Sequence, residues 1–157
     1  MVTVRRAEPA DAPELVRLRQ VMLDSVRPGP SDVSWHAAAE RRLRTRLGAP
    51  DADLAAFVVD GPDGLAACVI GAIEYRLGSP GNPDGLTGYV FSVATDPGHR
   101  RLGFSRACME ALLEWYRERG VTRIDLRASP EAEPLYTSLG FVRTPDPAMR
   151  LTLSPPG

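Results

Sequence analysis

The residues best suited to chemistry lie in a short loop, RRLGFS over residues 100–105, between a hydrophobic stretch and a long amphipathic segment. The apolar residues of that segment recur at steps of three and four, which predicts a helix over residues 103–119. A helix N-terminus offers unpaired backbone N–H groups and a partial positive charge, so it attracts anions. Gly103 lets the backbone approach a ligand closely, and the arginines add charge. The spacing therefore predicts a phosphate-binding strand–loop–helix.

The arginines of this loop also admit a second interpretation, as solvated surface charges. All 19 basic residues of the chain are arginine, so the bias extends far beyond this loop and is not evidence for phosphate-binding forks at one place. An arginine at the start of a helix also opposes the helix dipole. The residues by themselves leave both interpretations open.

Two motifs together resemble the signatures of the GNAT acyltransferase superfamily. The first is RxxGxS over residues 100–105, after a hydrophobic strand and Asp96-Pro97, which is similar to the acyl-CoA loop of that family. The second is PLYTSLGF over residues 134–141, which resembles a short helix that carries Leu-Tyr and closes in Leu-Gly-Phe. Either motif alone is unspecific, but their order, with a strand between them, favours this family. The resemblance covers residues 87–153.

For the donor, the resemblance implies acetyl-CoA as the co-substrate. In this family the last residues of the strand before the loop bind the pantetheine arm through their backbone, and the loop amides hold the pyrophosphate. The donor-binding residues implied here are Val93, Ala94, Thr95, Arg100, Arg101, Leu102, Gly103, Phe104, Ser105 and Arg106. The family has glycine or alanine where Ser105 stands, but serine is small and can itself donate a hydrogen bond. We therefore expect donor binding to be retained.

For catalysis, the resemblance implies that Tyr136 is the general acid. Many members of the family place a tyrosine at this point, near the sulfur of CoA. A phenol held there can protonate the departing thiolate. The alternative is a half-buried tyrosine that only stabilises a short helix, and the Leu-Gly-Phe context favours the acid.

The general base is not defined by the sequence. The family often carries a glutamate where Tyr89 stands, and no carboxylate lies between Tyr89 and Thr95. Glu74, on the neighbouring strand, and Asp84, in the loop that follows it, are candidates, although each is also an ordinary solvated charge. Water acting through Ser92, or an amine that arrives already neutral, would serve instead. Attack within a ternary complex needs mainly positioning and a neutral amine.

The sequence does not define the acceptor substrate either. In this fold the first two helices and the loop after the third strand usually wall the acceptor side, which implies Met22, Trp35, Tyr75 and Tyr89 as candidates. Each of these side chains also suits a core. Small amines, amino acids, antibiotics, polyamines and protein N-termini all remain open.

Composition excludes several classes of protein. A chain of 157 residues with 43% hydrophobic residues suits one domain, and no apolar run approaches the length of a membrane span. A net charge of −1 argues against binding to nucleic acid. Cys68 and Cys108 lie in apolar patterns typical of reduced core residues, the two histidines form no metal cluster, and the N-terminus lacks a signal peptide's apolar region. We expect a cytoplasmic, metal-free bacterial protein away from membranes, and leave a homodimer open.

The pattern of elements predicts an α/β (α+β) fold in one GNAT-type domain, residues 1–157. We expect a mixed, mostly antiparallel, twisted sheet with a central parallel βαβ unit flanked by helices. The strands predicted are 2–6, 54–60, 65–77, 89–95, 121–128 and 149–153. Two further helices are predicted, one opened by a capping box at Asp11–Glu14 and one capped by Ser34 and ended by Gly48.

Three functions are consistent with these residues. We favour an acyl-CoA-dependent N-acyltransferase that moves acetyl from acetyl-CoA to a primary amine by direct attack. The alternative is a catalytically degenerate GNAT domain that senses acyl-CoA or mediates assembly, which the missing base carboxylate supports. A different phosphate-binding α/β enzyme is disfavoured, because neither GxxxxGK nor GxGxxG is present.

Overall fold

The computed structural model describes residues 1–49 and 51–156. They form two compact units, Met1–Arg127 and Ala128–Gly157, and each unit is considered by itself. In the part of the chain that the structure describes, no helix is both long and apolar enough to cross a bilayer.

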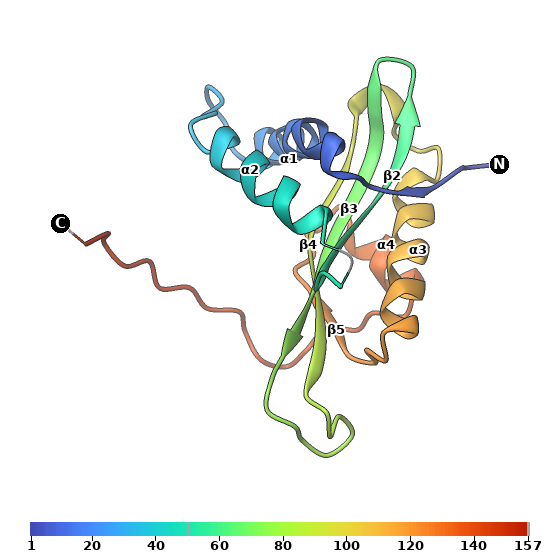
Figure 1. Ribbon diagram of the computed structural model, residues 1–157, viewed down its shortest axis with the longest axis vertical. Coiled ribbons are helices and arrows are strands. Elements are labelled where there is room, and N and C mark those ends of the chain that lie inside the picture. The colour runs from blue at the N-terminus through green and yellow to red at the C-terminus, as the bar shows by residue number, and fades with distance from the viewer. Residues whose placement is uncertain (50, 157) are drawn as a thin grey trace. The chain divides into compact units, whose positions relative to one another are not determined.

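The first unit is built on a five-stranded sheet with the order β1-β2-β3-β4-β5 (Figure 1). The strands are β1 Arg5–Arg6, β2 Leu54–Gly61, β3 Gly64–Tyr75, β4 Leu86–Thr95 and β5 Ile124–Leu126. Neighbouring strands are antiparallel, except that β5 runs parallel to β4. The predicted mixed, mostly antiparallel sheet with a parallel βαβ unit is therefore confirmed.

Helices cover both faces of this sheet. α1 (Ala12–Val26) and α2 (His36–Leu47) lie on one face, and α3 (Phe104–Glu118) lies on the other (Figure 1). Two short 3-10 helices, Pro9–Asp11 and Pro97–His99, precede α1 and follow β4. The helix predicted over 103–119 is thus confirmed to within one residue at each end.

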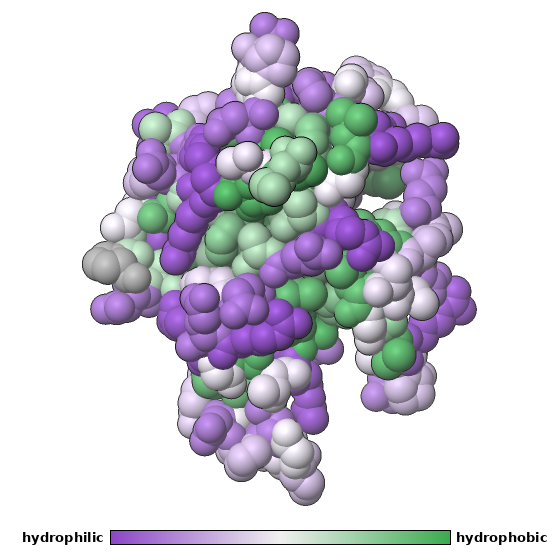
Figure 2. All heavy atoms as spheres, turned by 90° about the vertical axis from the view of Figure 1, so that its right-hand side faces the viewer, coloured by the Kyte–Doolittle hydropathy of each residue, from purple (hydrophilic) through white to green (hydrophobic). Residues whose placement is uncertain are grey.

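The apolar stripes of the helices supply the core, as their spacing requires. α1 buries Leu15, Val16 and Leu18 against the sheet. α3 buries five side chains three and four residues apart, Cys108, Met109, Leu112, Trp115 and Tyr116. Its outward residues, Glu110, Glu114 and Arg117, are exposed. Viewed from the side where α3 lies, hydrophilic side chains stand beside hydrophobic ones (Figure 2).

Both cysteines are buried and unpaired, as predicted. Burial raises the pKa of the Cys68 thiol and of the Cys108 thiol to about 12. A thiol that stays protonated at neutral pH is a poor nucleophile. The two cysteines therefore act as small apolar core residues.

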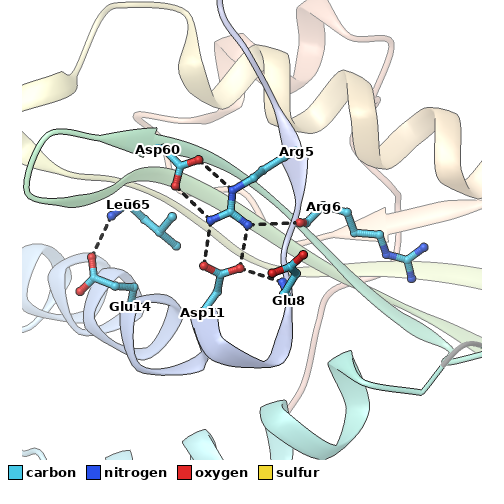
Figure 3. A network of polar contacts seen from close by, with 7 residues as sticks. All are labelled: Arg5, Arg6, Glu8, Asp11, Glu14, Asp60 and Leu65. Atoms are coloured by element: carbon cyan, nitrogen blue, oxygen red, sulfur yellow. Dashed lines mark hydrogen bonds and ion pairs between the residues drawn. The ribbon is translucent and has the colours of Figure 1, made fainter.

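The capping box predicted at Asp11–Glu14 is wrong. The Asp11 carboxylate accepts hydrogen bonds from Arg5 Nη1 and Nη2 at 2.8 and 2.9 Å and from the Glu8 amide at 2.7 Å. Glu14 accepts from the amide of Leu65, at 2.8 Å, instead of closing a box (Figure 3). The carboxylate forms two charge-assisted bonds with the Arg5 guanidinium, so it points to Arg5 and not to the first amides of α1. Arg5 also binds Asp60, which joins β1 to the end of β2.

The cap predicted at Ser34 is also wrong. The Ser34 hydroxyl donates to Asp32 Oδ1 at 2.6 Å. The helix α2 begins at His36, and the residue before it, Trp35, forms no side-chain cap. The Ser34 hydroxyl therefore bonds a neighbouring carboxylate in place of the helix amides. The end of α2 before Gly48 is as predicted.

Residues 128–156 of the second unit contain one helix, α4 (Glu133–Ser138), which includes the predicted Leu-Tyr pair. Residues 141–156 are described and contain no strand, so the strand predicted over 149–153 is wrong. Alternating apolar residues fit a strand only when a neighbouring strand completes the ladder. No such neighbour pairs with 149–153 among the described residues.

A close approach between sheet and helix gives a stability prediction. A Cβ added at Gly88 would lie 2.7 and 2.8 Å from Cε1 and Cζ of the buried Tyr116 ring. The Tyr116 hydroxyl donates to the carbonyls of Ala72 and Tyr89 at 3.1 and 3.3 Å, so the ring cannot move aside freely. We expect Gly88→Ala to cost about 1–3 kcal/mol of unfolding free energy, as overpacking does.

Denaturant unfolding measures this cost, with Gly98→Ala as the matched control. A Cβ at Gly98 meets only Asp96 Oδ1, at an ordinary 3.7 Å. The control should unfold close to wild type. Equal stability of Gly88→Ala and wild type would contradict the packing described here.

Candidate functional site

The loop between β4 and α3 places a helix N-terminus beside an open turn. Gly103 precedes α3 with φ +79°, and Arg101 also has a left-handed φ, +63°. None of the described side chains caps this helix. The amides of Phe104 and Ser105 lie in its first turn and so have no intrahelical acceptor. A Cβ at Gly103 would meet no described heavy atom within 4 Å, so the approach to these amides is open.

A hydroxyl pair fixes the loop between its two flanking elements. Thr95 Oγ1, at the end of β4, lies 2.8 Å from Ser105 Oγ in the first turn of α3. Either hydroxyl can donate. When Thr95 donates, Ser105 keeps its own proton for a ligand, so this bond does not exclude the predicted contact with a phosphate.

The edge of β4 next to the loop offers backbone groups. The Asp96 amide donates to the Ala66 carbonyl at 2.8 Å, and an antiparallel ladder alternates, so Ala94 also directs its backbone toward β3. Val93 and Thr95 then direct theirs to the opposite side. On that side, among the described residues, β5 pairs only with Gly88–Val90 of β4. Val93 and Thr95 therefore present amides and carbonyls along an edge that leads from the loop.

A salt-bridge network holds the start of this loop. Arg17 of α1 donates to Glu14 Oε2 at 2.8 Å, to Asp96 Oδ2 at 2.9 Å and to the Leu65 carbonyl at 2.9 Å. Asp96 Oδ1 in turn accepts from the Gly98 amide at 3.1 Å. The Arg17 guanidinium holds the pKa of both the Asp96 and the Glu14 carboxyl below its usual range. The network joins α1, β3 and the turn after β4.

A second arginine of α1 reaches β4 farther from the loop. The β3–β4 register shifts between Ile70 and Gly71, which leaves Phe91 as the extra residue of a bulge. Arg19 Nη1 donates to the carbonyl of Phe91 at 2.9 Å. Beside it, Ser92 Oγ is buried and lacks a hydrogen-bond partner among the residues described.

Sequence reasoning missed both Arg17 and Arg19. Arg19 follows Leu18 and stands four residues after Leu15, so it extends the buried stripe of α1. A charged residue at a partly buried helix position needs a polar partner, and that was the available signal. Arg17 carried no such signal in a chain whose basic residues are all arginine.

The two carboxylates considered as the general base lie at exposed positions. Glu74 is exposed and pairs with Arg76 Nη2 at 2.9 Å. Asp84 is exposed in the loop between β3 and β4. Tyr89 is half-buried, on the stretch of β4 that pairs with β5. Within the described residues no group of three or more His, Cys, Asp or Glu side chains is arranged to hold a metal ion.

The acceptor-side candidates differ from one another. Met22 packs against the core cluster, and Trp35 Nε1 donates to Gln20 Oε1 at 3.1 Å. Tyr75 is 79% exposed. These three therefore include one core residue, one residue that joins α2 to α1, and one surface residue.

Tyr136 belongs to the second unit. It lies in α4, is 6% exposed, and its ring makes an edge contact with Phe141 at 5.9 Å between centroids. Burial raises the pKa of its phenol. A phenol in that environment is protonated at neutral pH, which an acid requires.

A known protein family matches most of this chain. The model of the Acetyltransferase (GNAT) family matches residues 19–141. The chain therefore belongs to the GNAT acetyltransferase family, whose co-substrate is acetyl-CoA.

The relatives cover the chain to different extents. It is 40% identical over 57 residues to serotonin N-acetyltransferase 2, chloroplastic, of Oryza sativa subsp. japonica, and 35% identical over 57 residues to GCN5-related N-acetyltransferase 1, chloroplastic, of Arabidopsis thaliana. Each match spans 36% of this chain but only 28% and 29% of those relatives.

A solved structure shares the whole fold. It is a predicted acetyltransferase from Clostridium acetobutylicum, crystallised with acetyl-CoA, which superposes with a TM-score of 0.83 at 23% identity over 97% of this chain and 96% of that one.

The Arg17 network yields a pH-dependent prediction. Carboxyls with a lowered folded-state pKa stabilise the fold above their unfolded pKa, about 4, and lose that contribution as pH falls through the folded pKa. Arg17→Met should therefore lower the melting temperature at pH 7. The gap to wild type should narrow below about pH 4, where the wild-type carboxyls also lose their charge.

Thermal melts between pH 7 and pH 3 measure this gap. Arg41→Met, on the exposed side of α2, makes the same chemical change away from the network and should melt like wild type. A gap that is absent at pH 7, or equally wide at pH 3, would contradict the role given to Arg17.

Proposed function

We propose that this chain is an N-acetyltransferase that transfers acetyl from acetyl-CoA to a primary amine by direct attack in a ternary complex. The observation that carries the proposal is the uncapped N-terminus of α3 behind Gly103, which adjoins a β4 edge with outward backbone groups. A turn that binds anions, next to a strand edge with outward backbone groups, suits a particular kind of ligand. That ligand has a pyrophosphate at one end and an arm that contains amides.

The residues present suit two parts of that donor, the pyrophosphate and the pantetheine arm. The amides of Phe104 and Ser105 would hold the pyrophosphate, with charge from the arginines of the loop. Val93 and Thr95 would bond the two amides of the pantetheine arm. Because pairing with β5 resumes at Val90, the acyl end of the donor would lie near the bulge at Phe91.

Acetyl-CoA supplies a thioester, whose C–S bond breaks as the amine nitrogen bonds to the carbonyl carbon. The leaving sulfur must end as a thiol, so it needs a proton. Tyr136 is the proposed donor of that proton, because a phenol is protonated at neutral pH.

The base is the least specified part of the proposal. Glu74 is engaged by Arg76 at the surface, so it is the poorer candidate. The buried Ser92 hydroxyl adjoins the bulge and could position a water. An acceptor that binds as a neutral amine needs no base before it attacks, because holding it near the thioester supplies much of the rate. The proton that its nitrogen loses as the amide forms then restores the Tyr136 phenol that protonated the sulfur. The rice relative is named for serotonin, an amine, which supports an amine acceptor.

The second candidate function is an acyl-CoA-binding module without turnover. The absence of any carboxylate from Tyr89 to Thr95 favours it. A screen of primary amines with acetyl-CoA, following free thiol, separates the two. Thiol release above the no-amine rate supports the enzyme, whereas saturable acetyl-CoA binding without release for any amine class supports the module.

Replacing the loop glycine tests the donor site. Gly103→Val should weaken acetyl-CoA binding at least tenfold, because a β-branched residue resists a left-handed φ and its side chain fills the approach to the amides. Calorimetry measures the affinity.

The matched control is Gly120→Val, at the other end of α3. Gly120 has φ +74° and equally open space, so it should suffer similar backbone strain while binding acetyl-CoA like wild type. If Gly103→Val folds and binds as tightly as the control, the pyrophosphate site lies elsewhere.

Replacing the phenol tests the acid. Tyr136→Phe keeps the ring beside Phe141 and removes the proton, so turnover should fall about 10- to 1000-fold. The affinity for acetyl-CoA should hardly change, because the lost interaction develops in the transition state. Steady-state rates with an accepted amine, together with binding constants, measure both; an unchanged rate would make Tyr136 structural.

A further inference from the structure

The strand β5 carries a carboxylate, Asp125, directly beside Tyr89 of β4. The two residues are Cα partners in the parallel register of β4 and β5, so their side chains share one face of the sheet. A Cβ at Gly88 would meet the Tyr116 ring of α3, so Gly88 faces α3 and Tyr89 faces the opposite side. Asp125 therefore points to the face on which α1 and α2 lie (Figure 1).

The Asp125 carboxylate keeps its capacity to accept hydrogen bonds. Its one ion pair among the described residues joins Oδ2 to Arg76 Nη1 at 3.6 Å, which is beyond hydrogen-bond distance. Arg76 bonds Glu74 more closely, through Nε at 3.0 Å and Nη2 at 2.9 Å. Arg123 and Arg127 flank β5, and in the part of the chain that the structure describes neither forms an ion pair with Asp125. The lone pairs of Asp125 are therefore available to a ligand with N–H donors.

This carboxylate lies near the place proposed for the thioester. Tyr89 precedes the bulge at Phe91 by two residues, which is about 7 Å along β4. A nitrogen that donates to a carboxylate at about 2.8 Å and approaches a carbonyl carbon to about 3–3.5 Å covers about 6 Å. The spacing between Asp125 and the bulge therefore suits one amine nitrogen held between the carboxylate and the thioester.

The charge of the acceptor gives this carboxylate a task. A primary alkylamine is mostly a cation at neutral pH, because its pKa lies near that of lysine, about 10.4. An ammonium group brings three N–H donors and needs an acceptor for them when it leaves water. No carboxylate lies between Tyr89 and Thr95 on the strand proposed to hold the donor, and Glu74 is engaged by Arg76. Strand pairing places Asp125 where that acceptor is needed.

We propose that Asp125 binds the ammonium group of the acceptor, which makes primary alkylamines that are cationic at neutral pH the substrate class of this chain. The inference rests on the proposed N-acetyltransferase activity. One ammonium proton passes to solvent through the carboxylate, and the lone pair that it leaves bonds to the thioester carbon as the C–S bond breaks. The sulfur takes the proton of the Tyr136 phenol, and the second proton that the nitrogen loses restores that phenol.

Two amines of different charge test this role. The probes are the fastest primary alkylamine of the thiol-release screen and aniline, which is neutral at pH 7. Asp125→Asn keeps the size of the side chain and removes its charge. It should lower kcat/KM for the alkylamine about 10- to 100-fold, mainly through KM, because a hydrogen bond to a charged group is lost. Any acetylation of aniline should stay at the wild-type rate, and Asp125→Glu should restore part of the alkylamine rate.

Two further variants separate binding of the amine from a structural ion pair. Arg76→Met breaks the ion pair and leaves the charge of Asp125, so it should not reproduce the loss seen in Asp125→Asn. Asp63→Asn, in the turn between β2 and β3, makes the same chemical change elsewhere and should behave like wild type. Calorimetry should find the acetyl-CoA affinity of all these variants unchanged, because none of them alters the loop before α3.

The outcomes distinguish this inference from the function on which it rests. A wild type that acetylates alkylamines, with Asp125→Asn equally active on them, would overturn the role of Asp125 and leave the proposed function standing. Equal losses in Asp125→Asn and Arg76→Met would make Asp125 a structural partner of Arg76, and a wild type that prefers aniline would overturn the substrate class. A wild type that releases thiol with none of the amines would overturn the proposed function and this inference with it.

Discussion

The site depends on one cation, Arg17, which bonds Glu14, Asp96 and the Leu65 carbonyl at once. Exposed ion pairs contribute only about 0–1 kcal/mol each, so the importance of Arg17 is geometric. Its bond to Asp96 fixes the residue at which β4 stops. The bond from the Gly98 amide to the same carboxylate holds the turn that follows. Where β4 stops decides where α3 begins.

The loop combines features that would be unfavourable in a purely structural turn. An uncapped helix, a non-glycine residue at positive φ and neighbouring arginines each cost free energy in the absence of an anion. A phosphate would reverse these terms, because it satisfies the amides and offsets the charge. Without an anion, the hydrogen bond between Thr95 and Ser105 still holds the first turn of α3 in place. Such local inconsistency is expected at a binding site.

The helices and the loop could be predicted because each follows from local spacing, and the sheet could be predicted because the order of the elements resembles that of the GNAT fold. The stripe from Phe104 to Trp115 defines a helix wherever it folds, and Gly103 and Gly120 mark its ends. The caps at Asp11 and Ser34 failed because their side chains found charged or acidic partners that helix rules do not include. The strand over 149–153 failed because a strand is defined by its neighbour, which spacing along one chain cannot reveal. The contacts of Arg17 with Asp96 and of Arg19 with Phe91 were missed because these partners lie 79 and 72 residues away.

The most direct test of the donor site is a melting curve recorded with rising acetyl-CoA. A ligand that binds only the folded chain stabilises it by about 2.7 kcal/mol at about 100 times its dissociation constant. We predict a progressive rise in melting temperature over micromolar concentrations. A curve that millimolar acetyl-CoA leaves unmoved, but that a nicotinamide or adenine nucleotide alone shifts, would contradict the assignment of the β4–α3 turn to acetyl-CoA.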